Sequence, residues 1–196
     1  MLTTKARTVR KETGTGTELI PSGGAGLYVA GININYVLGL GIIEESVEIP
    51  VFTKVGTDED WVLVSGEDKL CMAVKKNGSL WSWGIDADTL NRLVPSVDLK
   101  YADFAQISSS SYNSVAIDNK GKLYTRGDNK YSQLGRHTRE DRDDRWGIVT
   151  EVNGNGEWLQ ADTGYYFTIA INSSGVMFAG GRNYYGQCGH GKASEF

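Results

Sequence analysis

The sequence is short of the residues from which most metal centres and many active sites are built. It has only two cysteines, Cys71 and Cys188, and only two histidines, His137 and His190. Two cysteines far apart neither form a metal-ligand cluster nor require an oxidising compartment, so we expect two free thiols. Neither histidine is flanked by a recognisable nucleophile motif. These shortages predict a chain that is not an enzyme and uses no cofactor.

Carboxylates are present, but they lack the spacing of a hard-cation loop. They cluster at Asp86 and Asp88, and again at Asp141, Asp143 and Asp144. Neither group has the ordered oxygen-ligand spacing of a calcium loop, and arginines stand among the second group. We therefore predict no metal site.

Long apolar runs and helical patterns are also missing. No apolar run approaches the length that crosses a bilayer, and residues 1–25 show no secretory signal. No stretch of about ten residues has convincing helical periodicity. We therefore expect a soluble chain with no membrane partner, located in the cytoplasm or in a virion.

The charge is uneven along the chain. The net charge is −4, but residues 1–25 carry four basic and two acidic side chains, so the remainder is more acidic than the total. A negative body lacks the basic surface that displaces counterions from nucleic acid, so nucleic-acid binding is disfavoured. Residues 1–25 are rich in Thr and Gly and show no periodicity, which predicts an extended polar and basic arm.

What the sequence does have is an internal repeat that can be followed four times. A short apolar segment containing an aromatic residue ends in a glycine in each copy. The copies are Leu27–Gly31, Leu80–Gly84, Leu123–Gly127 and Met177–Gly181. In three copies Asn follows the glycine at +2 and Gly at +8: Asn33/Gly39, Asn129/Gly135 and Asn183/Gly189.

A second element precedes three of these copies. An aromatic residue stands twelve positions before an alanine, and a small or branched apolar residue stands three positions after the aromatic. The aromatic and alanine pairs are Trp61/Ala73, Phe104/Ala116 and Trp158/Ala170. Glycine follows each alanine at +5, where we expect a hairpin turn. Short alternating segments around each alanine predict strands, so the fold class is all-β. The repeat aromatics are expected in the blade cores, packed against the counterpart in the next blade.

These elements resemble the regulator of chromosome condensation (RCC1-like) repeat family, whose β-propellers have blades of about fifty residues. The best matches are Gly78–Gly84, Tyr131–Gly135 and Tyr185–Gly191. The family's frequent His three residues before the alanine is replaced by Leu70, Asn113 and Phe167. The resemblance implies an incomplete propeller of three to four blades over residues 26–196, since a full ring of the family has seven. Open blade edges would need a cap, so we expect the chain to associate with itself or with other subunits.

Candidate partner-binding residues lie outside the repeat positions. The segment 136–145 is rich in charged residues but neutral overall. Its four arginines are spaced so that they could pair with acidic residues on a short helical turn and bind a partner. The alternative is a solvated insertion whose charged side chains pair with one another. Aromatics on variable loops are the other candidates. The predicted residues are Arg136, Arg139, Arg142, Arg145, Trp146, Tyr101, Tyr165, Tyr184 and Tyr185.

Two functions remain open at this stage. The first is a non-enzymatic structural or assembly protein in a multi-subunit particle, such as a bacteriophage capsid decoration or tail component. The alternative is a regulatory protein-binding module, either a nucleotide-exchange factor for a small GTPase or a protein inhibitor, because the resembled family includes both. Fold alone does not choose between them.

Overall fold

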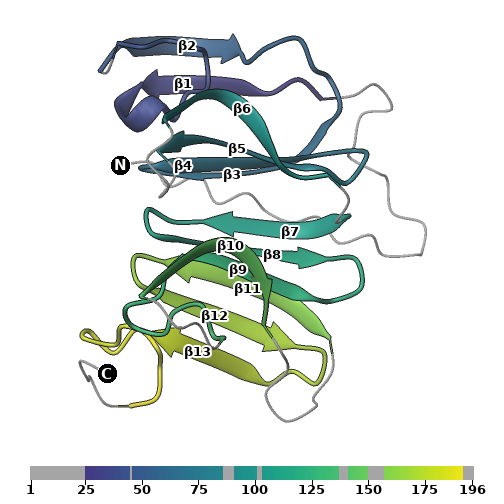
Figure 1. Ribbon diagram of the computed structural model, residues 1–196, viewed down its shortest axis with the longest axis vertical. Helices are drawn as coiled ribbons and strands as arrows, with labels where there is room; N and C mark the ends of the chain where they lie inside the picture. Colours follow the sequence, from purple (N-terminus) through teal and green to yellow (C-terminus); the bar gives the residue numbers. More distant parts are fainter. Residues whose placement is uncertain are drawn as a thin grey trace. The chain divides into compact units, whose positions relative to one another are not determined.

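The computed structural model describes residues 25–44, 46–85, 91–100, 103–136, 141–149 and 157–191, apart from the side chains at positions 142, 144 and 145 (Figure 1). Within them the structure is built of strands, and its only helical segment is the 3-10 turn Ile34–Tyr36. The all-β prediction is confirmed. The strands are β1 Tyr28–Ile32, β2 Glu48–Lys54, β3 Trp61–Glu67, β4 Leu70–Lys75, β5 Leu80–Ile85, β6 Asn91–Leu99, β7 Phe104–Ser109, β8 Asn113–Asp118, β9 Leu123–Asp128, β10 Arg142–Ile148, β11 Trp158–Gly164, β12 Phe167–Asn172 and β13 Met177–Gly181.

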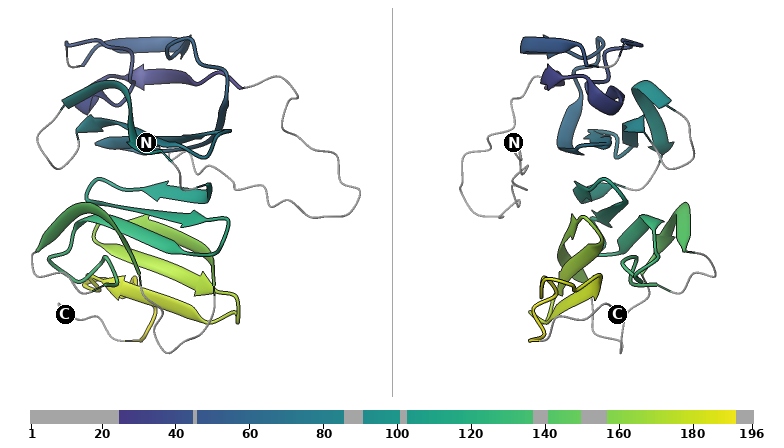
Figure 2. Two further views of the ribbon diagram at one scale, coloured as in Figure 1. Left: turned by 45° about the vertical axis from the view of Figure 1, so that its right-hand side comes forward. Right: turned by 90° about the vertical axis from the view of Figure 1, so that its left-hand side faces the viewer.

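The described residues form two compact units, which meet in the sequence between Asp103 and Phe104. The first unit contains the pair β1–β2 and the four-stranded sheet β3-β4-β5-β6; the second contains the four-stranded sheet β7-β8-β9-β10 and the three-stranded sheet β11-β12-β13. Every pairing is antiparallel between strands consecutive in sequence, so each sheet is a meander (Figures 1 and 2).

The spacing of the repeated residues is explained by strand register. The apolar residue three positions after each aromatic lies directly opposite the alanine, in the pairs Val64↔Ala73, Ile107↔Ala116 and Ala161↔Ala170. A register shift follows the aromatic in all three first strands. The alanines are buried between neighbouring strands, where a larger side chain would not fit a close-packed core.

Each repeat aromatic of the first strand meets an aromatic ring of its own sheet. Trp61, Phe104 and Trp158 are buried and meet Trp81, Tyr124 and Phe178 edge to face, with ring centroids 5.8, 5.5 and 5.1 Å apart. The expectation that the repeat aromatics pair with the next blade's counterpart is therefore wrong for these contacts. The reason is that the first and third strands both flank the small alanine strand, which brings their rings together across it.

Tyr28 also departs from the core prediction, because it is 53% exposed. It occupies in β1 the position of Trp81 in β5, but β1 pairs with β2 alone among the described strands. Among the described strands, the sheet β1–β2 has no equivalent of β3, the strand that supplies Trp61 as the aromatic partner of Trp81.

The terminal glycine of the repeat is required by a close backbone approach. A Cβ atom at Gly84, Gly127 or Gly181 would lie 2.3 Å from the carbonyl oxygen of Lys69, Tyr112 or Tyr166, respectively. The three glycines also have φ values between +104° and +115°, which L side chains rarely adopt. The residue after each glycine donates its backbone N–H to that same carbonyl at 2.8 Å. This contact ties the third strand to the hairpin between the first two.

The asparagine at +2 stabilises the turn that follows. The side-chain oxygens of Asn33, Asn129 and Asn183 accept the backbone N–H five residues later, at 3.3, 3.0 and 2.9 Å. The glycines at +8 have φ between +62° and +74°. The polar repeat positions are therefore part of the scaffold.

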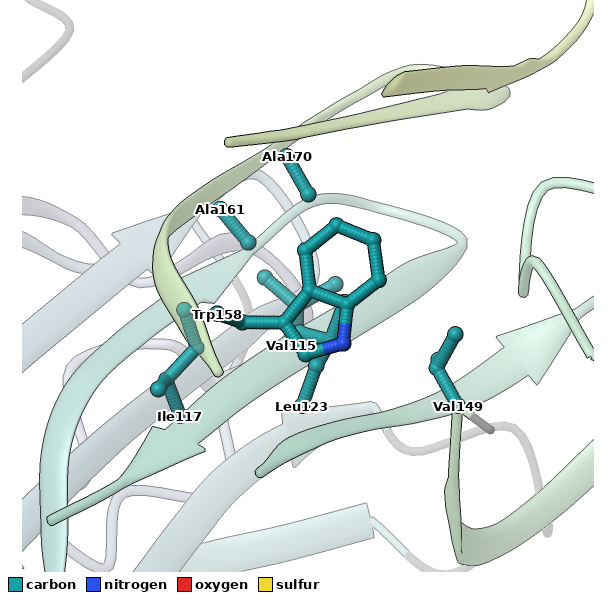
Figure 3. Packing of buried hydrophobic residues seen from close by; sticks show 7 residues of the cluster. All are labelled: Val115, Ile117, Leu123, Val149, Trp158, Ala161 and Ala170. Atoms are coloured by element: carbon teal, nitrogen blue, oxygen red, sulfur yellow. The ribbon is translucent and has the colours of Figure 1, made fainter. Parts of the chain in front are cut away.

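The second unit has a continuous core between its two sheets. Trp158 and Ala161 of β11 pack with Val115 and Ile117 of β8 and with Leu123 of β9 (Figure 3). In the first unit the corresponding core gathers Leu27, Val55, Trp61, Ala73 and Trp83. Burial of a large apolar side chain contributes about 1.5–3 kcal/mol, so these clusters stabilise each unit.

The short helical turn expected in the arginine-rich segment is wrong for its described part. Residues 142–148 form β10, which pairs with β9 at Arg142↔Asp128 and Asp143↔Gly127. A sheet neighbour that satisfies the backbone groups outweighs the weak i,i+3 charge pattern of the sequence. The predicted arm, residues 1–25, lies outside the described residues except for Ala25, whose carbonyl accepts the Trp61 N–H at 3.3 Å.

Candidate functional site

An exposed group of tyrosines lies along the loops of the second unit. Tyr112 is in the loop between β7 and β8, and Tyr165 and Tyr166 form the turn between β11 and β12. The terminal-glycine contact holds both loops, since Tyr112 and Tyr166 supply the carbonyls approached by Gly127 and Gly181. Their backbones are thus part of the scaffold, and their rings stack on each other.

The same contact places Arg182 beside these rings. Its backbone N–H is the group that donates to the Tyr166 carbonyl at 2.8 Å. Its guanidinium carbon then lies 5.7, 6.0 and 5.4 Å from the ring centroids of Tyr131, Tyr166 and Tyr184. Distances within about 6 Å allow cation–π attraction, so Arg182 is the centre of the group.

The rings are linked to one another by short contacts. Tyr112 stacks on Tyr166 at 4.4 Å and meets Tyr165 edge to face at 4.7 Å, with the hydroxyls of Tyr112 and Tyr165 3.1 Å apart. Tyr131 meets Tyr166 at 5.2 Å. Tyr184 and Tyr185 pair at 4.9 Å. We call the set the tyrosine–arginine surface; it consists of Tyr112, Tyr131, Tyr165, Tyr166, Arg182, Tyr184 and Tyr185.

This surface is open to a partner. Tyr165, Tyr184 and Tyr185 are 53%, 48% and 82% exposed, whereas Tyr112, Tyr131, Tyr166 and Arg182 are half-buried beneath them. Desolvation, with the neighbouring Tyr112 hydroxyl and Asp128 carboxylate, raises the pKa of Tyr166 above its ordinary value. Its hydroxyl therefore stays protonated at neutral pH and can donate a hydrogen bond.

Three of the predicted binding residues, Tyr165, Tyr184 and Tyr185, are thus brought together by the structure. The sequence analysis missed Tyr112, Tyr131, Tyr166 and Arg182. One signal could have found two of them: Tyr112 and Tyr166 both stand four residues before a repeat alanine. The contact through Arg182 joins loops from two sheets and has no signal in a linear pattern.

Two other predicted residues lie away from this surface, in contacts within the sheet of β7 to β10. The Arg136 guanidinium donates from Nε to Thr125 Oγ1 at 3.1 Å and pairs with the Asp143 carboxylate at 2.9 Å. Trp146 lies 6.3 Å from Phe104 and under the Arg126 guanidinium, 5.0 Å from its carbon. Tyr101 and Arg139 fall outside the described residues, as do the side chains of Arg142 and Arg145.

The described residues contain no group of three or more His, Cys, Asp or Glu side chains arranged to hold a metal ion. Both cysteines are free thiols. Burial raises the pKa of the Cys71 thiol to about 12, which disfavours the nucleophilic thiolate. Within the same ranges, no helix is long and apolar enough to span a membrane.

Taken together, meandering four-stranded sheets with one repeated register, one repeated aromatic pair and one repeated glycine contact define the blades of a β-propeller repeat. The model of the regulator of chromosome condensation (RCC1) repeat matches residues 104–133, which cover β7, β8 and β9. The chain is an RCC1-like repeat protein, as the sequence resemblance predicted.

Curated relatives share this repeat. The chain is 28% identical over 140 residues to the ultraviolet-B receptor UVR8 of Arabidopsis thaliana, a match covering 65% of this chain and 31% of the receptor. It is 26% identical over 131 residues to protein pim1 of Schizosaccharomyces pombe, covering 62% of this chain and 24% of pim1. The matches thus span less than a third of either relative.

Solved structures share the fold. Human WBSCR16 superposes with a TM-score of 0.71 at 18% identity, covering 88% of this chain and 47% of that one. Prp20p of Saccharomyces cerevisiae superposes with a TM-score of 0.68 at 14% identity, covering 87% and 44%. Identities this low establish the fold and leave the activity open. An RCC1-like propeller indicates a protein-binding or regulatory module, and nothing in these comparisons indicates a virion or bacteriophage role.

Proposed function

We propose that this chain is a non-enzymatic, regulatory protein-binding module that engages its partner through the tyrosine–arginine surface. The observation that carries the proposal is a group of six tyrosines, three with ring centroids within about 6 Å of one arginine and three about half exposed or more. Tyr and Arg are the residues most enriched at the energetic centres of protein interfaces. A tyrosine ring supplies a large contact area while losing few rotamers on binding.

The relatives support a protein partner over other classes. The structure of yeast Prp20p is described together with its binding to Gsp1p and histones, and a second structure holds Kap60 bound to it. The net charge of −4 argues against a nucleic acid as the partner of this chain. The regulatory alternative of the sequence analysis is therefore better supported than the virion component.

Site-specific photocrosslinking tests the proposal. A photoreactive phenylalanine analogue placed at Tyr185 is expected to capture a discrete protein partner in extracts of the source cells. The same analogue at Phe52, a 79% exposed residue of β2 in the first unit, is the matched control. Identical capture from both positions, or none at Tyr185, would contradict the proposed surface.

Native mass spectrometry across a dilution series separates the module from the assembly subunit. We expect a monomer at all concentrations if one specific partner is bound through this surface. A stable oligomer that persists on dilution would instead favour the assembly interpretation, in which copies cap one another's open strand edges.

A further inference from the structure

Arg182 differs from Arg92 and Arg136 in its side-chain contacts. Arg92 donates to Ser82 Oγ at 2.6 Å and pairs with the Asp98 carboxylate. Arg136 makes the equivalent contacts in the next sheet, to the Thr125 hydroxyl and the Asp143 carboxylate. Arg182 forms no ion pair with any carboxylate among the described residues; its contacts are with tyrosine rings.

The charge around Arg182 is locally positive on an acidic chain. Lys130 is exposed, and its Nζ lies 5.8 Å from the centroid of the same Tyr131 ring. The Asp128 carboxylate acts electrostatically on Tyr166. Its Oδ1 already accepts the Lys130 backbone N–H at 2.9 Å and the Gln133 side-chain amide at 3.0 Å. Lys130 and Arg182 thus share one tyrosine ring, and the Asp128 Oδ1 is engaged by donors of its own loop.

From this we propose that the tyrosine–arginine surface binds an acidic segment of a protein partner, with a carboxylate of that segment on the Arg182 guanidinium. The inference rests on the proposed function and names its partner chemistry. In the proposed complex the tyrosine rings hold the guanidinium in place, and it donates two parallel hydrogen bonds to the carboxylate. Apolar side chains flanking that carboxylate would pack on Tyr165, Tyr184 and Tyr185, which are the exposed rings.

A matched pair of peptides tests the chemistry without knowing the partner. The first is a short fluorescein-labelled peptide in which glutamate alternates with leucine and serine; the second has every glutamate replaced by glutamine. We expect fluorescence anisotropy to detect binding of the glutamate peptide, weakened by added salt, and at least about tenfold weaker binding of the glutamine peptide.

Variants locate the binding to Arg182. Arg182→Gln is expected to weaken binding of the glutamate peptide about tenfold or more, and Arg182→Lys to weaken it less, because a lysine keeps the charge but loses the planar fork. Lys76→Gln removes the same charge from an exposed turn of the first unit and should leave binding unchanged. Circular dichroism of each variant establishes that it remains folded.

Three results would overturn the inference: no binding of the glutamate peptide, equal binding of the glutamine peptide, or equal losses in Arg182→Gln and Lys76→Gln. A peptide carrying phosphoserine that binds where the glutamate peptide does not would also assign a different ligand. Capture at Tyr185 in the crosslinking experiment does not depend on any of these results. The partner chemistry can therefore fail while the proposed function stands.

Discussion

The two four-stranded sheets, one in each unit, have the same interior but different loop edges. In both, the first-strand aromatic is buried edge to face on its third-strand counterpart, and the glycine ending the repeat approaches a hairpin carbonyl. The residue that supplies this carbonyl is Lys69 in the first sheet and Tyr112 in the second. The comparison teaches that the contact constrains the backbone and does not specify which side chain stands there, so function can differ where the scaffold does not.

A second difference lies in the β-turns of the same sheets. Asp118 Oδ1 accepts the backbone N–H groups of Lys120 and Lys122, both at 2.9 Å. The equivalent residue of the first sheet, Lys75, lies over Trp61 and Trp81 and pairs with Asp58 at 2.9 Å. The residue at this position therefore caps the turn of the second sheet but packs and pairs outside the turn in the first, where Asn77 Oδ1 accepts the Ser79 N–H at 3.0 Å instead. The glycine of each turn has φ near +75°.

The largest expected effect comes from removing the buried first-strand aromatic, which stands at the equivalent position in both sheets. Trp61→Ala and Phe104→Ala should each lower the free energy of unfolding of their unit by about 3–5 kcal/mol, because each leaves a cavity at a buried position. Chemical denaturation measures the loss. Tyr28→Ala, at an exposed repeat position, is the control and should cost far less. A small effect in only one of the two sheets would break their equivalence.

A smaller loss is expected at the terminal glycines. Gly127→Ala should destabilise by about 3 kcal/mol, since the new Cβ would lie 2.3 Å from the Tyr112 carbonyl at an unfavourable φ. Gly31 has a similar φ, but a Cβ atom there would meet nothing within 4 Å. Gly31→Ala should therefore cost only the backbone penalty of about 1–2 kcal/mol. Equal losses in thermal or denaturant unfolding would show that the carbonyl contact does not matter.

The asparagine that holds the post-glycine turn should give a more modest effect. Asn129→Ala removes the acceptor of the Leu134 backbone N–H and is expected to cost about 1–2 kcal/mol. Asn183→Ala should behave alike, because its oxygen accepts the Cys188 N–H at 2.9 Å. Amide hydrogen exchange at Leu134 and Cys188 reports each turn separately, and unchanged protection of these amides would contradict the assigned role.

The Cys71 thiol gives a prediction in pH. Burial raises the pKa of this thiol to about 12, so at pH 8 far less of the folded protein carries the thiolate than of an ordinary free thiol, of which about a quarter is ionised. In a Cys188→Ser background, a disulfide reagent at pH 8 should therefore label Cys71 much more slowly in the folded than in the denatured chain. Raising the pH toward 12 should increase labelling of the folded chain. Rapid labelling at pH 8 would contradict the burial of this thiol.

The smallest effect on stability, and the largest difference in function, is expected at the tyrosine–arginine surface. Tyr185→Ala should change the free energy of unfolding by less than about 0.5 kcal/mol, because the ring is 82% exposed. The same change should reduce partner binding measurably. Phe52→Ala in the first unit is the matched control and should affect neither quantity strongly. Loss of binding in both variants would show that removing any exposed aromatic ring weakens partner binding, and that the tyrosine–arginine surface has no specific role.

Much of the fold could be predicted because it depends on local spacing. The hairpin turns at Gly78, Gly121 and Gly175 lie where the pattern placed them, each with φ between +73° and +79°. Partner choice between aromatics was not predictable. The spacing of Trp61 and Trp81 is equally compatible with contact inside one sheet or with the next, and only the strand register decides.

Only part of the candidate surface could be predicted from the sequence, for the same reason. Tyr165, Tyr184 and Tyr185 could be singled out as aromatics on loops, but a charge cluster drew attention to Arg136, whose guanidinium is occupied by Thr125 and Asp143. Arg182, which follows the repeat glycine Gly181, was not among the predicted residues. Its role depends on which rings and carboxylates lie near it in space.

The sequence by itself determined the all-β class, the repeat and the positions of the turn glycines, because these depend on backbone geometry that is local and recurs at fixed spacing. Tertiary structure alone decided which side chains meet. Hydrogen bonding within the sheet β11-β12-β13 brings Arg182 to Tyr166, and packing of β11 against β7 and β8 brings Tyr112 onto Tyr166. A surface assembled in this way has no period in the chain.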